Sequence, residues 1–125
     1  MAVCARLGVP HVERTEDPGV WIRGGQRKIC ALGVQVRRGI TSHGVGLNCY
    51  DRDQWLSWGF GRIVACGLEG KETTWLARET SDEVLIRDVG QVASEFVQTF
   101  ASKLGNVEEV YDSVDPAPDR ALKSP

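Results

Sequence analysis

Residues 20–50 read VWIRGGQRKICALGVQVRRGITSHGVGLNCY, and this stretch decides the fold. Runs rich in Val and Ile are separated in it by two turn signals that contain glycine, Gly24-Gly25 and Arg38-Gly39. Short β-prone runs divided by such turns are typical of hairpins. The stretch therefore predicts three consecutive antiparallel strands, at residues 20–22, 28–36 and 41–50.

The second predicted strand has one face more apolar than the other. With a period of two, Cys30, Leu32, Val34 and Val36 share the face that Lys28 begins. A lysine at the end of a strand usually extends its ammonium into solvent. The alternative is a lysine held in a partly desolvated pocket, and the spacing alone does not choose between them.

The third predicted strand contains two glycines. His43 and Val45 share one face of it, while Gly44 and Gly46 interrupt the strand pattern. Glycines inside a strand indicate a bulge, a bend, or a ligand that approaches the backbone closely. All three interpretations remain open at this stage.

Outside this stretch, the sequence predicts several short elements and one long helix. Asp88 begins the helix with a capping-box pattern, an apolar stripe at helical spacing follows, and Gly105 ends it. We interpret this stripe as core packing. The other predictions are a helix at 3–7 that ends at Gly8, a short helix within 51–60 capped by Asp51 or Asp53, a short apolar run at 63–66 that ends in a Cys-Gly turn, and short strands at 72–77 and 84–86.

This order of elements predicts the fold class. A β-rich centre followed by one amphipathic helix favours an α+β (mixed α/β) fold, with a mainly antiparallel sheet and the helix packed on one face. Residues 1–110 are expected to form the domain. Residues 111–125, rich in Asp, Pro and Ser, are expected to form a disordered tail.

Composition excludes several classes of protein. The chain has 125 residues, which suits one domain, and its 15 Lys and Arg against 17 Asp and Glu give a net charge of -2. We therefore expect no nucleic-acid binding through bulk charge. No apolar run approaches the roughly 18 residues of a membrane-spanning helix. The first residues lack the apolar core of a secretory signal.

The four cysteines are Cys4, Cys30, Cys49 and Cys66. None forms a C-x-x-C pair, so we expect neither a structural zinc site nor a disulfide framework, and reduced thiols in an intracellular compartment fit best. Cys66 precedes Gly67 at the end of an apolar run, where a turn could expose its sulfur. A nearby Lys28 or His43 would favour the thiolate and make Cys66 a nucleophile. A buried, inert cysteine is the commoner case.

Several strings, taken in order, carry a family resemblance. They are PGVWI at 18–22, RKICALG at 27–33, ITSHG at 40–44, LNC at 47–49, CGLEG at 66–70 and Thr73-Thr74. Together they resemble the lipoyl(octanoyl) transferases, of the lipoate-protein ligase B type, from about residue 8 to residue 104.

The resemblance implies a biotin/lipoate ligase-like fold and an acyltransferase of lipoate biosynthesis. Such enzymes move an octanoyl group from acyl carrier protein to a lysine of lipoyl domains, those of 2-oxoacid dehydrogenase complexes and the glycine cleavage H protein. The route passes through a cysteine acyl-thioester, here at Cys66, with Lys28 lowering the pKa of the thiol. No metal or cofactor is implied. The implied substrate-binding residues are Ala31, Leu32, Gly33, His43, Gly44, Val45 and Gly46.

The sequence departs from the family pattern in several places. Ala65 stands where a proline usually precedes the cysteine, and Glu72 and Trp75 replace a small residue and a serine. The stretch between Asn48 and Cys66 is longer than usual. The Arg-Gly-Gly and His-Gly-Pro-Gly-Gln motifs of the family's N-terminal half are absent, so we expect the C-terminal half of an N-terminally truncated domain.

Two alternatives accompany the octanoyltransferase hypothesis. One is a catalytically inactive truncated isoform or remnant that at most binds acyl or carrier-protein partners. The other is a structural α+β domain with four inert thiols. By resemblance, the expected location is mitochondrial, or cytoplasmic if the source is bacterial.

Overall fold

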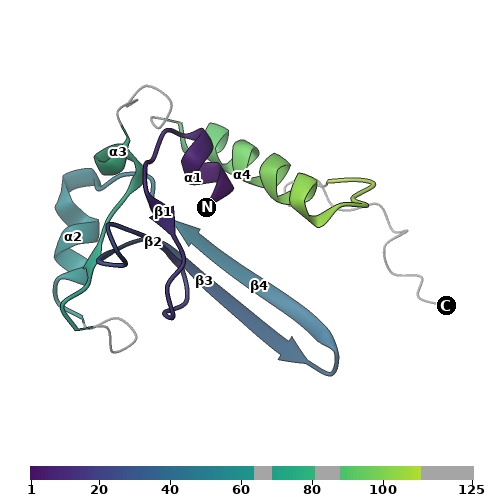
Figure 1. Cartoon of the computed structure of the whole chain (residues 1–125), viewed down its shortest axis with the longest axis horizontal. Helices are drawn as coiled ribbons and strands as arrows, with labels where there is room; N and C mark the ends of the chain where they lie inside the picture. Colours follow the sequence, from purple (N-terminus) through teal and green to yellow (C-terminus); the bar gives the residue numbers. More distant parts are fainter. Residues whose placement is uncertain (64–68, 81–87, 111–125) are drawn as a thin grey trace.

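The computed structural model describes residues 1–63, 69–80 and 88–110. Within them the chain forms an α+β fold around a mainly antiparallel sheet, as the sequence predicts (Figure 1). The strands are β1 (Val12–Glu13), β2 (Val20–Ile22), β3 (Arg27–Arg37), β4 (Ile40–Leu47) and β5 (Glu72–Thr73). The helices are α1 (Ala2–Arg6), the 3₁₀ turn η1 (Arg52–Gln54), α2 (Trp55–Phe60), α3 (Leu76–Glu79) and α4 (Val89–Leu104).

The sheet is organised around β3. The order β1-β2-β3-β4 is antiparallel throughout, and β5 adds to β3 in parallel. Because β5 pairs with β3 at Arg27 and Lys28, while β4 pairs with it from Cys30 onward, β4 and β5 follow one another along the same edge of β3. The start of β3 is therefore paired on both edges, whereas its outer part pairs with β4 alone.

The core lies where the inner half of the sheet meets α1 and α4. The short helix α1 packs against α4 and is linked to it by a salt bridge between Arg6 Nε and Glu95 Oε1, 2.6 Å long. Fully burying an aliphatic side chain contributes about 1.5–3 kcal/mol to stability. The buried core cluster consists of Val3, Cys4, Leu7, Val9, Val20, Ile22, Ile29, Cys30, Leu76 and Val92.

Several element predictions are confirmed. The α1 helix ends before Gly8, whose φ of +73° suits glycine. The two hairpins form at the predicted turns. Asp51 accepts hydrogen bonds from the backbone N–H groups of Leu56 and Ser57 at the start of α2. Asp88 accepts one from Gly90 N at 2.8 Å at the start of α4.

Other predictions need correction. The strand predicted at 72–77 stops at Thr73, and α3 follows, because Leu76 N and Ala77 N donate to the carbonyls of Asn48 and Cys49 and turn the chain. The strand predicted at 41–50 ends at Leu47. The β3–β4 register is continuous past Gly44 and Gly46, so the bulge interpretation is wrong; the sheet's register shift lies at Val20/Trp21.

The apolar stripe of α4 is buried only in part. Val92 is buried and Phe96 packs against the core, but Val97, Phe100 and Leu104 are exposed. The interpretation of the stripe as core packing is therefore right for Val92 and Phe96 but wrong for Val89, Val97, Phe100 and Leu104. Among the described residues, α1 packs against α4 and lies near the first half of the helix (Figure 1).

Three sequence predictions fall outside the described ranges. They are most of the apolar run at 63–66, the strand at 84–86 and the tail at 111–125. None of the described helices is both long and apolar enough to cross a membrane.

Candidate functional site

Lys28 lies in the inner part of β3, where the strand has partners on both sides. It is opposite Trp21 of β2 and opposite Thr73 of β5. Its Nζ lies 4.6 Å from the centroid of the Trp21 ring, a cation–π distance. The side chain is half-buried, so Lys28 does not simply extend into solvent. This arrangement agrees with the less common of the two sequence interpretations, a lysine in a partly desolvated pocket.

The pocket beside Lys28 is small, about 50 Å³. Phe60 and Ile63, at the end of α2, close one side of it, and Glu72 and Thr73 of β5 close another. Trp21 and Lys71 complete the lining. A pocket of this size suits a single functional group rather than a whole acyl chain.

A polar cluster behind Lys28 ties β3 to α3. Arg27 Nη1 lies 2.9 Å from Glu79 Oε1, and both side chains are 9% exposed. The hydroxyl of Thr74, which is fully buried, donates to Glu79 at 2.6 Å. Asn48 Nδ2 donates to the Thr74 carbonyl at 2.9 Å. The Asn48 and Thr73-Thr74 motifs therefore have a structural role: they fasten the ends of β4 and β5 beside β3.

The predicted substrate-binding residues face one another across the β3–β4 ladder. The register pairs Ala31 with Gly46, Leu32 with Val45, and Gly33 with Gly44. Two segments that the sequence places more than ten residues apart thus come together in one hairpin. His43, paired with Val34, lies one step further out, and its Nε2 is 3.1 Å from Thr41 Oγ1.

Strand alternation divides these seven residues between two faces. Leu32, His43 and Val45 share the parity of Lys28. The small residues occupy the opposite face, and nothing lies within 4 Å of a Cβ built on any of its three glycines. The small residues are Ala31, Gly33, Gly44 and Gly46. All seven are exposed in the part of the chain that the structure describes.

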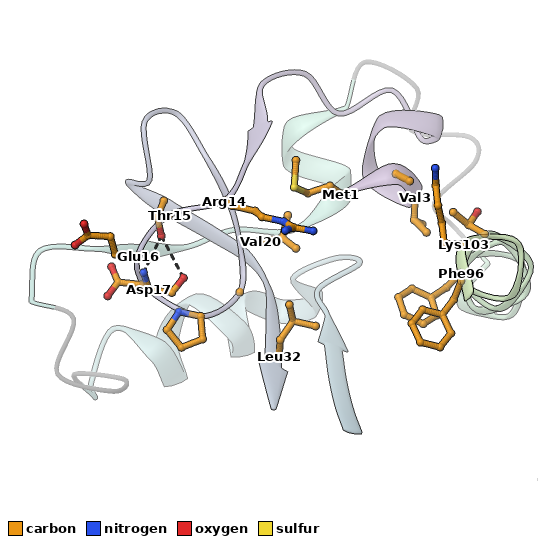
Figure 2. Close-up of a pocket in the computed structure, with 15 residues that line it drawn as sticks. Met1, Val3, Arg14, Thr15, Glu16, Asp17, Val20, Leu32, Phe96 and Lys103 are labelled. Carbon is orange, nitrogen blue, oxygen red and sulfur yellow. Dashed lines mark hydrogen bonds between the residues drawn. The ribbon is translucent and has the colours of Figure 1, made fainter. Parts of the chain in front are cut away.

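Leu32 also lines a large open cavity of about 870 Å³ (Figure 2). Phe96 and Phe100 of α4 form its opposite wall, while Val20 and the loop at 14–19 form its floor. Gly19 connects this cavity to the lysine, because a Cβ built on Gly19 would lie only 3.1 Å from Lys28 Cε. An apolar chain in the cavity would therefore have one end near the stem of Lys28.

Cys66 lies outside the residues that the structure describes. The other three cysteines are free thiols, and burial raises the pKa of each, that of Cys30 to about 11. A raised thiol pKa leaves a cysteine protonated and weakly nucleophilic at neutral pH. Burial therefore disfavours the thiolate form of Cys4, Cys30 and Cys49.

The described residues contain no cluster of three or more His, Cys, Asp or Glu side chains that could hold a metal ion.

Comparison with known proteins decides the family. The family model described as "Lipoyl protein ligase A/B catalytic domain" matches residues 1–101 of the chain. The chain belongs to the lipoyl protein ligase A/B catalytic-domain family. Its relatives are octanoyltransferases, as the sequence motifs indicate.

Three relatives show how far the likeness extends. The mitochondrial octanoyl-[acyl-carrier-protein]:protein N-octanoyltransferase of Xenopus tropicalis is 49% identical over 70% of this chain and 34% of its own length. The octanoyltransferase of Acidothermus cellulolyticus is 45% identical over 71% of the chain and 40% of its own length. That of Desulfovibrio desulfuricans is 40% identical over 97% and 44%. The chain thus spans less than half the length of these relatives. No solved structure matches the chain.

Sequence reasoning missed one lysine that lies beside Lys28 in this lipoyl ligase family member. Lys71 Nζ lies 4.8 Å from the Trp21 ring centroid and 3.0 Å from Asp17 Oδ2. Two lysines therefore face one buried tryptophan. The sequence gives only a weak signal for this. Lys71 directly follows the CGLEG motif, but a single lysine after a motif does not indicate a contact with a distant tryptophan.

Proposed function

We propose that this chain carries the nucleophile and the activating lysine of an octanoyltransferase. In this proposal Cys66 accepts an octanoyl group from octanoyl-acyl carrier protein and passes it to a lysine of a lipoyl domain, in protein lipoylation. The observation that carries the proposal is the setting of Lys28. Ile63, which precedes Cys66 in the sequence, and Lys71 and Glu72, which follow it, all line the Lys28 pocket.

The chemistry balances in two steps. The Cys66 thiolate attacks the thioester carbonyl, a new C–S bond forms, and the C–S bond to the carrier's thiol breaks. The carrier leaves as a thiolate and takes the proton that Lys28 holds after deprotonating Cys66. This exchange of one thioester for another is close to neutral in energy.

The second step forms the amide. The neutral amine of the acceptor lysine attacks the Cys66 thioester, and the C–S bond to Cys66 breaks as the C–N bond forms. The proton lost by the amine passes to Lys28, which acts as a general base and returns to its ammonium form, while Cys66 leaves as the thiolate. Lys28, Leu32, His43 and Val45 share one strand parity, which supports this face as the side along which the acyl chain lies.

Relatives' names support the finer assignments. The acyl-carrier-protein donor and the protein acceptor follow the name of the Xenopus tropicalis enzyme. We extend the acceptors to the lipoyl domains of 2-oxoacid dehydrogenase complexes and the glycine cleavage H protein on the sequence resemblance. A mitochondrial location follows the same relative, and a cytoplasmic one would apply to a bacterial source.

The test is intact-mass spectrometry after mixing the full chain with octanoyl-acyl carrier protein. We expect an increment of one octanoyl group, mapped to Cys66 and removed by neutral hydroxylamine, which cleaves thioesters. Cys66→Ala should abolish the increment, whereas Cys49→Ala, at a half-buried free thiol, should retain it. Lys28→Met should slow adduct formation by about 100-fold, at the low end of a general acid–base contribution. An adduct on another residue, or none, contradicts the proposal.

A second candidate function is binding of acyl or carrier-protein partners without turnover. It is favoured by one observation: the seven residues predicted to bind substrate are exposed and divided between two faces, and the cavity next to Leu32 is open. Calorimetry with the same octanoyl-acyl carrier protein distinguishes the two. Binding heat with no mass increment supports the second candidate.

A further inference from the structure

Trp21 is the common neighbour of two lysines that come from different parts of the chain. Its ring is only 1% exposed, and the ammonium groups of Lys28 and Lys71 lie 4.6 and 4.8 Å from its centroid. Lys28 begins β3, and Lys71 immediately precedes β5, which pairs with β3 at Lys28. The parallel pairing of these two strands thus brings both cations to one aromatic ring.

Asp17 holds the ring and the second lysine together. Its carboxylate Oδ2 accepts from Lys71 Nζ at 3.0 Å, and its carbonyl accepts from Trp21 Nε1 at 3.0 Å. Thr15 braces the same residue: its hydroxyl accepts from Asp17 N and donates to Asp17 O, both at 3.2 Å (Figure 2). The loop at 15–19 therefore fixes the orientation of Trp21 through one residue.

The same loop also limits where the Lys28 stem can lie. A Cβ built on Gly19 would be 2.7 Å from the Cys30 carbonyl and 3.1 Å from Lys28 Cε, and the φ of Gly19 is +134°. The aliphatic part of the Lys28 side chain thus packs against the Gly19 backbone, and its ammonium group lies on the Trp21 ring. Both surfaces that confine Lys28 are held by the segment that contains Asp17.

The charges are arranged unequally. Lys71 is paired with Asp17, and both side chains are about 30% exposed. In the described part of the chain, no carboxylate lies within 4.0 Å of Lys28 Nζ. Of the carboxylates near this site, Glu72 is directed to Arg78 at 3.8 Å, and Glu79 to Arg27. Lys71 thus pairs with Asp17, the loop carboxylate whose own backbone carbonyl holds the ring that Lys28 faces.

We propose that Asp17 and Lys71 are positioning residues for Lys28. They keep the Trp21 ring in place and keep Asp17 from pairing with Lys28, so that the Lys28 ammonium stays on the ring and remains available to the thiol. This inference rests on the proposed function for the role of Lys28, but the placement of the ammonium is a separate, measurable property.

The first measurement is NMR of the full chain labelled with ¹³C-lysine. Protons above an aromatic ring shift upfield, so the ε-methylene signal of Lys28, identified by its loss in Lys28→Arg, should be upfield of the ordinary lysine position. Asp17→Asn and Lys71→Met should move it at least halfway to an ordinary lysine position. Lys71→Arg should preserve it. Lys103→Met, at the far end of α4, is the matched control and should have no effect.

The second measurement is the rate of octanoyl adduct formation on Cys66. Because misplacing one catalytic group is costly, we expect Asp17→Asn and Lys71→Met to slow it by about tenfold with unchanged melting temperature. Lys71→Arg should restore the rate to within about twofold.

The outcomes separate this inference from the proposed function. No adduct in the parent chain contradicts the proposed function, while the NMR result still decides the placement of Lys28. If the Lys28 signal in both Asp17→Asn and Lys71→Met stays at its position in the parent chain, the positioning role is overturned. If the signal moves in these two variants but the rate of adduct formation equals that of the parent chain, the positioning role is overturned too.

Discussion

Burial determines the chemistry of Cys30. The thiol lies in the core cluster at 4% exposure, and burial, with a smaller contribution from Cys4, raises its pKa from 9.0 to about 11. An unfolded chain would ionise this thiol near its ordinary value. The difference between the two states links the stability of the fold to pH.

We therefore expect stability to decrease in alkaline solution. Below pH 9 the thiol is protonated in both states and its contribution is fully present. As the pH rises towards about 11, only the unfolded state ionises, and roughly 2–3 kcal/mol is lost, at about 1.4 kcal/mol per pKa unit. Urea unfolding at pH 8 and at pH 10.5 measures this. Cys30→Ala should be less stable at pH 8 but lose less on going to pH 10.5; an equal loss would show that another group is responsible.

At the residue scale the sequence identified Lys28 but not its neighbours. Alternation in 28–36 placed Lys28 on the apolar face, and the structure finds it half-buried on Trp21. The Asp17–Lys71 pair joins positions 54 residues apart, and no local pattern encodes a contact of that kind. The assignments of Cys66 and of the seven substrate-binding residues remain predictions.

At the scale of elements, local signals predicted helices and hairpins, whereas tertiary contacts decided the remainder. Local sequence determines both hairpin turns and both ends of α4, which begins after Asp88 and ends at Gly105. The segment after β5 has strand-like composition, but hydrogen bonds from Leu76 and Ala77 to distant carbonyls make it helical. Such long-range bonds override propensity, and a single sequence does not display them.

Asp88 offers a test at this scale. Its side chain accepts from Gly90 N at 2.8 Å and satisfies a donor at the free end of a 16-residue helix. Asp88→Ala should lower the free energy of unfolding by about 1 kcal/mol, measured by urea denaturation. Asp88→Ser retains an acceptor and should cost less than half as much. Equal losses in the two variants would mean that the cap is not the cause.

For the whole molecule, the main feature is how much apolar surface lies beyond the core. The outer hairpin exposes Leu32, Val34, Val36, Ile40 and Val45, each more than 40%, and the second half of α4 is exposed as well. Figure 1 shows both elements extending away from the core on the same side. The sequence predicted the sheet and the helix, but periodicity reveals which side is apolar, not whether a neighbour covers it.

We expect the two halves of β3 to differ in hydrogen exchange. Its inner residues, 27–30, have partners in β2 and either β5 or β4, whereas residues 31–37 pair only with β4. Isolated two-stranded ribbons are marginally stable in water. Amides of 31–37 should therefore exchange at least about tenfold faster than those of 27–30, measured by mass spectrometry on peptides. Uniform protection along β3 would contradict this.

The shared edge of β3 also orders the events of folding. The β3–β4 hairpin joins neighbouring residues, so its loop closes at small entropic cost and it can form early. The pairing of β5 with Arg27 and Lys28 closes a loop from residue 28 to residue 73, and Thr74 and Leu76 bond to groups that the hairpin must first present. The surroundings of Lys28 are therefore completed only after the hairpin, and a nascent chain has a hairpin before it has a pocket.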